Sequence, residues 1–319
     1  MTRLWTAVVL AFNLLFSGVA LAAGPYPVHL PASPLGVDPQ AVTVIGQTQE
    51  YEIQKGDTLL DVARDYGLGY LELGQLYRHW DPFLPTVGAR ITIPTTWIVP
   101  DCQNRQLVVN TGEMRLYKFA DNARKVYTFP IGMGVLDFKT PTGTYKVTEK
   151  KVKPSWYVPK SLQAKYGMAV MPPGPDNPLG DYKLTLSWGD YGIHGTSMPW
   201  GVGRLVSHGC TRMYPEHIKE LFPMVPVGAV VEYIYEPVKI GFRHGRIYLE
   251  VNEDYYHRIP DMLIHTLNQL EDRGLITEID YSKVVKIVEE KLGLPEEITK
   301  RTEGVAATCL THTLESTNE

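Results

Sequence analysis

A histidine and a cysteine stand in one short, glycine-rich stretch of the chain. His194 is followed by Gly195 and Thr196, and a short loop later Cys210 lies within VSHGCTRMYP. A thiol attacks a carbonyl carbon as the thiolate, and with a free pKa of about 8.5 only a few per cent is ionised near neutral pH. An imidazole within hydrogen-bond reach supplies the missing base. The two residue types therefore predict nucleophilic acyl transfer, with Cys210 as the nucleophile and His194 as its base.

The residues around this pair favour the same chemistry. The glycines and proline of GTSMPWGVGRLV suit a loop that returns between neighbouring strands, which would bring His194 beside the segment that carries Cys210. His208 lies two positions before Cys210, so in an extended segment both side chains would project to one face. Gly209 has no side chain, which lets substrate and backbone N–H groups approach closely. We expect His208 and Gly209 to help form the site.

Two other interpretations of these residues stay open. Two histidines and a cysteine could bind zinc with an open fourth position, but the usual Cys-x-x-Cys or His-x-x-x-His spacing is missing and no nearby carboxylate stands out as a supporting partner. The histidines could also be buried structural residues beside an inert thiol. Because three such groups converge among glycines, we favour catalysis and expect neither a metal nor another cofactor.

Length, charge and the first residues bound the class of protein. The 319 residues are 44% hydrophobic with a net charge of -4, which suits two or three small domains and gives no sign of nucleic-acid binding. Residues 1–23 combine Arg3, an apolar run and an Ala-x-Ala exit, which predicts a secretory signal cleaved near Ala22 or Ala23. The alternative is an uncleaved membrane anchor. The rest of the chain is expected in the periplasm or cell envelope.

The three cysteines bear on the same compartment. Outside the cytoplasm cysteines tend to be oxidised in pairs, so an odd count leaves at least one thiol free or paired with another molecule. We expect Cys210 to be the free one. Cys102 and Cys309 could then pair, although the sequence does not show that they approach each other.

Changes in pattern along the chain predict five segments after the signal. They are a proline-rich extended lead-in (24–47), a compact strand-helix-helix-strand module (48–97), a β-rich domain (104–236), an α/β extension with two amphipathic helices (237–302) and a polar, disordered tail (303–319). The expected fold is therefore a mostly β domain with a small βααβ domain before it and a helical C-terminal extension after it.

The small module resembles a LysM domain. The likeness rests on YEIQKGDTL at its start, on ARDYG at the end of the first helix and on GARITIP at the closing strand. LysM modules bind the N-acetylglucosamine-containing glycan of cell walls, so the resemblance implies glycan binding by residues 48–97. The alternative is a small domain that only spaces the next one from the wall.

The β-rich domain resembles the YkuD-type L,D-transpeptidases, the cysteine enzymes that cross-link peptidoglycan. The likeness runs from about Gln106 to Tyr235 and is carried by HG at 194–195, SHGCTR at 207–212, TPTG at 140–143 and the YPEHIKELF helix. It implies a β-sandwich-like catalytic domain that needs no cofactor.

The resemblance also implies roles for the site residues. Cys210 would be the nucleophile, and His194 would accept and later donate the proton while the backbone carbonyl of Gly195 orients its imidazole. His208 and Gly209 would help shape the oxyanion site.

Two further residues of the same signature are expected to contact substrate. Ser207 would line the site. Arg212 would support the pocket or meet a substrate carboxylate, with a salt-bridged surface arginine as the alternative. The aromatic residues Trp188, Tyr191 and Trp200 are interpreted as packing residues.

The implied reaction begins with attack of Cys210 on the carbonyl of the third residue of a peptidoglycan tetrapeptide stem, which expels D-alanine and leaves a thioester. The acceptor would be a stem amine or the lysine of a wall-anchored lipoprotein. Two alternatives stay open: an L,D-carboxypeptidase in which water is the acceptor, and a non-catalytic wall-binding protein.

Overall fold

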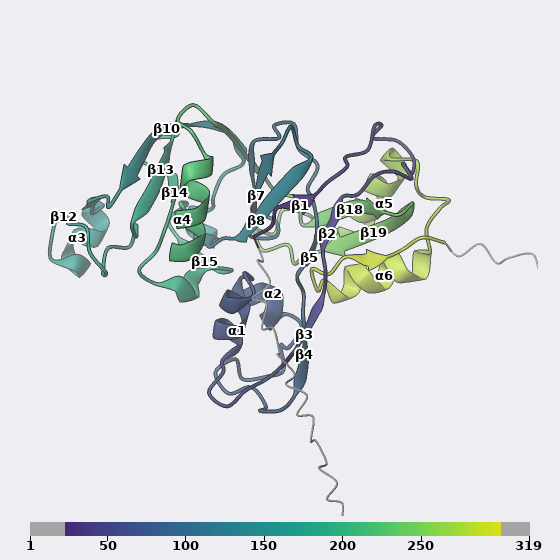
Figure 1. Cartoon of the computed structure of the whole chain (residues 1–319), viewed down its shortest axis with the longest axis horizontal. Helices are drawn as coiled ribbons and strands as arrows, with labels where there is room; N and C mark the ends of the chain where they lie inside the picture. Colours follow the sequence, from purple (N-terminus) through teal and green to yellow (C-terminus); the bar gives the residue numbers. More distant parts are fainter. Residues whose placement is uncertain (1–22, 301–319) are drawn as a thin grey trace, which may run out of the picture.

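The computed structural model describes residues 23–300, in which nine strands form one mixed sheet (Figure 1). The strands follow the order β1-β8-β7-β6-β17-β10-β13-β14-β16 across the sheet. All neighbouring pairs are antiparallel except β6 with β17 and β14 with β16. Their bounds are β1 (Tyr26–Pro27), β6 (Leu107–Asn110), β7 (Arg115–Ala120), β8 (Lys125–Pro130), β10 (Gly143–Val152), β13 (Tyr182–Leu186), β14 (Gly192–His194), β16 (Thr211–Arg212) and β17 (Val230–Ile234).

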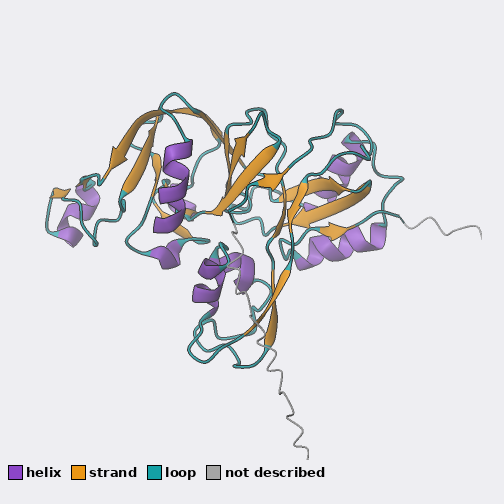
Figure 2. Cartoon of the chain, in the orientation of Figure 1, coloured by secondary structure: helices purple, strands orange, loops and turns teal. Residues whose placement is uncertain are grey.

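Strand β10 divides this sheet into two halves. Its first residues, from Gly143 to Lys146, pair with β17, whereas its residues from Val147 onward pair with β13, with a register shift between Val147 and Glu149. Such an irregularity bends a strand and increases its twist. The second half of the sheet, with β13, β14 and β16, is therefore turned relative to the first, as Figure 2 shows on the left of the view.

One helix, α4 (Pro215–Met224), packs against β13 and covers the core beside this half of the sheet. Pro215 stands at the first turn, and Ile218 and Leu221 are fully buried, so the helix expected after the cysteine is confirmed. The core also holds Leu116 and Phe129 from the first half of the sheet. The mostly β character expected for residues 104–236 is present.

Residues 44–98 form the unit that lies below the large sheet in Figure 1. Strand β2 (Val44–Gly46) pairs with β5 (Thr96–Ile98), and between them lie β3 (Gln49–Glu52), α1 (Leu59–Asp65), α2 (Tyr70–Gly74) and β4 (Arg90–Ile93), with β3 paired to β4. Thr58 caps α1 by accepting a hydrogen bond from the N–H of Asp61. The βααβ order is present, and membership of the LysM family stays a prediction.

The C-terminal extension consists of a three-stranded sheet covered by two helices. Its elements are β18 (Val238–Arg243), β19 (Arg246–Val251), α5 (Met262–Asp272), α6 (Tyr281–Glu290) and β20 (Glu296–Glu297). Both expected helices are present, each begun by an aspartate cap. The hairpin partner β18 was not expected from the sequence.

The three units are joined by buried charges. Arg115 is buried in the large sheet, where its guanidinium donates to both carboxylate oxygens of Glu72 on α2 at 2.6 and 2.8 Å and lies 4.0 Å from the ring centroid of Trp97. Lys239 of the extension is equally buried, and its Nζ lies 2.5 Å from Glu113 and 2.8 Å from Glu250. Because a buried charge without its partner is costly, these pairs fix the units to one another.

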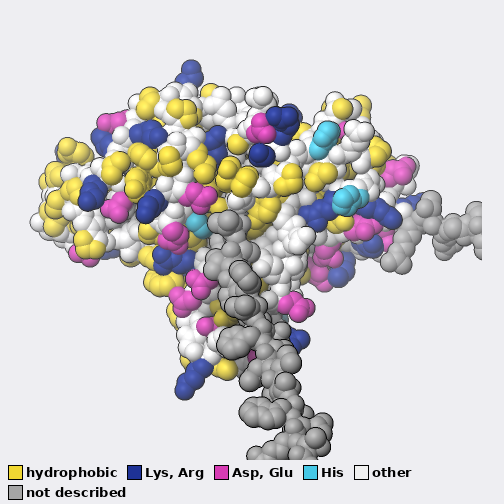
Figure 3. Space-filling model, in the orientation of Figure 1, with side chains coloured by type: hydrophobic (Ala, Val, Ile, Leu, Met, Phe, Trp, Pro, Cys, Tyr) yellow, Lys and Arg dark blue, Asp and Glu magenta, His cyan; other side chains and the backbone are white. Residues whose placement is uncertain are grey.

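The remaining elements are short. They are β9 (Met133–Gly134), paired with β15 (Leu205–Ser207), β11 (Trp156–Tyr157), paired with β12 (Val170–Met171), α3 (Lys160–Tyr166), and 3-10 turns at Leu136–Phe138 and Pro199–Gly201. No helix within residues 23–300 is long and apolar enough to cross a membrane. Positive and negative side chains are interspersed over the face seen in Figure 3.

Several expectations fall on residues that the structure does not describe. The secretory signal before Ala23, the polar tail and Cys309 all lie there, so they stay predictions. Cys102 is half-buried and forms no disulfide with another cysteine of residues 23–300, and burial raises the pKa of its thiol to about 12.

Candidate active site

Parallel pairing of β14 with β16 brings the two segments of the predicted pair together. His194 lies opposite Arg212, and Ile193 lies opposite Thr211. Continuing this register by one residue puts Cys210 opposite Gly192. Neighbouring strands are about 4.8 Å apart and rise about 3.3 Å per residue, which places the Cα atoms of His194 and Cys210 about 8 Å apart. The expected neighbourhood is confirmed, but the strand beside β14 is the one that follows the cysteine; the strand that precedes it, β15, pairs with β9 instead.

The side chains of this segment alternate between core and site. Thr211 points to the core, where its hydroxyl lies 3.0 Å from the hydroxyl of Tyr233. Alternation along the chain then directs Cys210 and Arg212 to the opposite face, the face on which His194 lies across the strand pair. Thiol, imidazole and guanidinium therefore share one side of the sheet.

The imidazole of His194 is held in one tautomer. It is 3% exposed, and its Nδ1 lies 2.6 Å from the carbonyl oxygen of Gly195, as the family resemblance implies. A carbonyl only accepts, so Nδ1 carries the proton and Nε2 keeps a lone pair. Burial and the charge of Arg212 lower the pKa of His194 to about 3. The ring is a neutral proton acceptor near neutral pH.

The thiol of Cys210 is also neutral at rest. Burial raises its pKa above the ordinary value of a thiol, although a backbone hydrogen bond from Gly192 and the charges of Lys183 and Arg212 oppose the effect. Because the thiol pKa lies far above the imidazole pKa, the proton resides on sulfur until a substrate arrives. The arrangement suits concerted proton removal during attack, rather than a preformed thiolate-imidazolium pair.

A tight turn precedes the cysteine, and the hydroxyl of Ser207 forms hydrogen bonds within it. Ser207 is 2% exposed; its Oγ accepts from the N–H of Gly209 at 3.1 Å and donates to the carbonyl of Cys210 at 2.6 Å. Gly209 has φ +104°, and a Cβ there would meet the ring of Tyr191 at 2.5 Å. The hydroxyl of Ser207 thus both accepts and donates within the turn, and the substrate contact expected for this residue stays a prediction.

The extended conformation assumed for the segment from His208 to Cys210 is not present. The segment is bent at residues 208 and 209, so strand alternation does not place the side chains of His208 and Cys210 on one face. His208 is exposed, and its ring centroid lies 4.7 Å from that of Phe138. A role for His208 and Gly209 at an oxyanion stays a prediction, and the N–H of Gly209 is engaged by Ser207.

Arg212 is half-buried without a carboxylate close by. Its Nε is buried with no hydrogen-bond partner among the described residues. The charges that act on it are those of Cys210 and Tyr166, while burial is the main effect and lowers its pKa. A salt-bridged surface arginine is therefore not what the structure shows, and a positive group stands beside the thiol.

One residue that supports this site was noted in the sequence only as part of a motif. Thr140 is buried; its hydroxyl donates to the carbonyl of Gly209 at 3.0 Å and accepts from the N–H of Gly134 at 2.9 Å. No local pattern reveals this contact, because Thr140 and Gly209 lie in distant parts of the chain. Trp188 stacks on Tyr191 with ring centroids 3.6 Å apart, which agrees with the packing role predicted for both.

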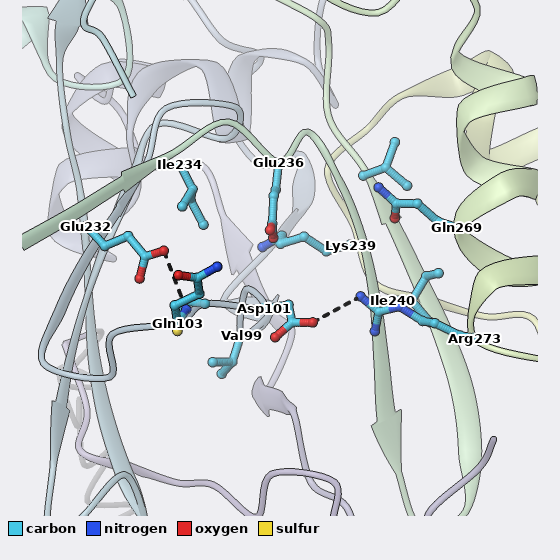
Figure 4. A pocket seen from close by; sticks show the side chains of 12 residues that line it. Val99, Asp101, Gln103, Glu232, Ile234, Glu236, Lys239, Ile240, Gln269 and Arg273 are labelled. Atoms are coloured by element: carbon cyan, nitrogen blue, oxygen red, sulfur yellow. Dashed lines mark hydrogen bonds and ion pairs between the residues drawn. The ribbon is translucent and has the colours of Figure 1, made fainter. Parts of the chain in front are cut away.

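A cavity of about 330 Å³ opens elsewhere, and neither His194, Cys210 nor Arg212 lines it (Figure 4). Asp101 and Arg273 form an ion pair at its wall, at 3.7 Å. Burial, together with Asp101, raises the pKa of Glu236 in this cavity to about 8. Within residues 23–300 no group of three or more His, Cys, Asp or Glu side chains is arranged to hold a metal ion.

Comparison with known proteins places this geometry among related chains. Residues 104–240 match the YkuD family, the L,D-transpeptidase catalytic domain. The chain is 40% identical over 219 residues to the probable L,D-transpeptidase YbiS of Escherichia coli K12, covering 66% of this chain and 71% of the relative. It is 30% identical over 276 residues to the probable L,D-transpeptidase YcfS of the same organism, covering 82% and 86%.

Solved structures also resemble part of the chain. The NMR structure of the catalytic domain from the Enterococcus faecium L,D-transpeptidase matches 42% of this chain and 100% of that chain, with a TM-score of 0.34 and 22% identity.

Proposed function

The chain belongs to the L,D-transpeptidase family of acyltransferases with a cysteine nucleophile, and we propose that Cys210 is that nucleophile and acts on peptidoglycan stem peptides. The observation that supports the proposal is the β14/β16 pairing, which brings the segment after Cys210 beside the strand that carries His194, whose Nδ1 is engaged by the carbonyl of Gly195. The substrate class is supported by the family, whose members act on peptidoglycan.

The first half-reaction forms a thioester. As sulfur attacks the carbonyl carbon of the third stem residue, the thiol proton passes to Nε2 of His194 and the carbonyl oxygen becomes an oxyanion. The carbonyl of Gly195, bonded to Nδ1–H, stabilises the imidazolium that forms. Collapse of the tetrahedral intermediate breaks the peptide bond, and Nε2 returns the proton to the departing amine of D-alanine.

The second half-reaction transfers the acyl group to an amine. The acceptor amine attacks the thioester, gives its proton to Nε2, and the departing thiolate is protonated by the same imidazole. The charge of Arg212 acts on sulfur and stabilises the thiolate in both steps, and contact of Arg212 with a stem carboxylate is part of the proposal. Stem cross-linking and lipoprotein attachment use the same steps with different amines.

Intact-mass measurement tests the proposal directly. The purified protein is incubated briefly with a disaccharide-tetrapeptide, beside a Cys210→Ala control, and the released products are analysed. A stem adduct lacking D-alanine on the wild type alone supports the thioester, while cross-linked dimers or tripeptides distinguish an amine acceptor from water. If Cys210 is reduced and the protein shows no adduct and no turnover, the catalytic proposal for this substrate is refuted.

The unit at 48–97 is proposed to bind the glycan strands of the wall, and residues 1–23 to direct export to the envelope. The βααβ order of β3, α1, α2 and β4 and the YEIQKGDTL pattern support the glycan proposal. Cosedimentation of the whole protein with insoluble peptidoglycan should be reduced by N-acetylglucosamine oligomers. Cosedimentation unaffected by such oligomers would favour a spacer role.

A further inference from the structure

A tyrosine of the C-terminal extension contacts the loop beside the catalytic turn. Tyr256 follows β19 and is 1% exposed. Its hydroxyl donates to the carbonyl of Gly134 at 2.8 Å and accepts from the N–H of Thr140 at 3.0 Å. One hydroxyl therefore ties together the two ends of the loop formed by residues 134–140.

This loop in turn holds the residue before the cysteine. The Thr140 hydroxyl donates to the carbonyl of Gly209, and Gly134 pairs with Ser207 at the start of the turn. Packing is close: a Cβ on Gly134 would lie 3.1 Å from the Cα of Gly209. Because both backbone groups held by Tyr256 are buried, loss of its hydroxyl leaves them unpaired. Movement of the loop is then transmitted to the turn.

Tyr256 is itself held by Tyr235, which follows β17, and by its own segment. Its ring stacks on Tyr235 with centroids 5.7 Å apart, and its N–H donates to the Tyr235 hydroxyl at 2.9 Å. That hydroxyl also bonds to Asp254, whose carboxylate accepts the N–H of Ile259 at 2.7 Å. The contact is thus made by an ordered part of the extension, not by a mobile side chain.

We propose that Tyr256 is a positioning residue for the nucleophile: through Thr140 it sets the backbone of the turn from which Cys210 projects. The extension is accordingly part of the catalytic apparatus, and this inference rests on the proposed function of Cys210. The catalytic residues remain those that touch the reacting atoms.

Tyr256→Phe in the full protein tests the inference, because it keeps the ring and removes only the hydroxyl. The matched control is the neighbour, Tyr255→Phe, which loses a half-buried hydroxyl bonded to Gln75 of the small domain and none to the loop. We expect Tyr256→Phe to slow thioester formation by about tenfold or more with KM within about twofold, and Tyr255→Phe to leave the rate unchanged.

Hydrogen exchange over residues 205–212 reads the same effect without activity. It should be faster in Tyr256→Phe by about tenfold and unchanged in Tyr255→Phe. If the wild type forms no thioester, the proposed function fails, yet the exchange comparison still decides the positioning role. Equal rates and equal exchange in the two variants would overturn the inference.

Thr140 supplies a second test if Tyr256→Phe fails to fold. Thr140→Ser keeps the hydroxyl and should retain the wild-type rate, whereas Thr140→Val should lower it as Tyr256→Phe does. Where all variants fold, the double variant Tyr256→Phe/Thr140→Val should be little slower than either single one, because both break one path. Equal rates for the serine and valine variants, or additive losses, contradict the inference.

Discussion

The ionisation state of the resting nucleophile gives a prediction that separates two kinds of cysteine enzyme. In a preformed ion pair the thiol has a pKa of about 3.5 to 7.5, so its alkylation rate stops rising once the pH exceeds that low pKa. Here burial places the pKa of Cys210 above 9.0 and that of His194 near 3. Between pH 6 and 9 both groups should therefore be neutral for most of the time.

The expected pH profile follows from these pKa values. With a thiol pKa above 9.0, less than about 1% of Cys210 is thiolate at pH 7, and the thiolate fraction rises about tenfold per pH unit. The rate of reaction with iodoacetamide should therefore increase about tenfold per pH unit from pH 6 to pH 8, without a plateau. His194→Ala should keep this slope, because a neutral imidazole adds no charge to the thiol, and should abolish thioester formation.

Intact mass after timed alkylation measures the rate at each pH. Cys210→Ala isolates the background from Cys102 and Cys309, and Cys102 should react slowly because burial raises the pKa of its thiol to about 12. A rate that is constant from pH 6 to pH 8 in the wild type and becomes pH-dependent in His194→Ala would refute the neutral pair. The mechanism would then begin from an ion pair instead.

Three other changes have expected outcomes. Glu72→Ala should lower the free energy of unfolding, measured with denaturant, by about 3 kcal/mol because it leaves the buried charge of Arg115 without its partner. The double variant with Arg115→Met should lose less stability than the two single losses added together. Burial raises the pKa of Glu236 from 4.5 to about 8, so the folded state holds a proton that the unfolded chain releases and stability falls as pH rises through that range; Glu236→Gln should remove this fall in melting temperature, and an unchanged pH dependence would contradict the pKa. Gly209→Ala should reduce thioester formation by more than about tenfold because φ is +104° and an aromatic ring lies 2.5 Å from the new Cβ, whereas Gly174→Ala, with open space and an ordinary φ, should not.

Local signals in the sequence were sufficient for the elements that depend on neighbouring residues. Thr58 and Pro215 mark helix starts because caps and first-turn prolines act within a few residues. The spacing of His194 and Cys210 predicted adjacent segments because a glycine-rich loop joins them. Burial of both groups, which sets their pKa values, depends on the whole domain and was not foreseen.

Contacts between distant segments had no local signal. The expectation for His208 assumed an extended chain, but the positive φ of Gly209 bends it, and a glycine alone does not announce its own φ. Ser207 was predicted to contact substrate from its place in the signature, and the hydrogen bonds of its hydroxyl within the turn had no signal in the sequence. Tyr256 is one of many tyrosines in the sequence, and only the folded extension places it against the loop before the turn.

The neck made by β2 and β5 bears on the order in which the chain can assemble. Val44 pairs with Ile98 across it, so the small domain leaves and rejoins the rest of the molecule at one point. Closing a flexible loop costs entropy that grows with the logarithm of its length, but a loop whose interior is already folded has its ends brought near each other. Strand pairing of β3 with β4 therefore lowers the entropy cost of pairing β2 with β5, which favours formation of the small domain before the neck. Ile98 at the end of this neck donates its N–H to a carboxylate oxygen of Glu250, so the neck is also bonded directly to the C-terminal extension.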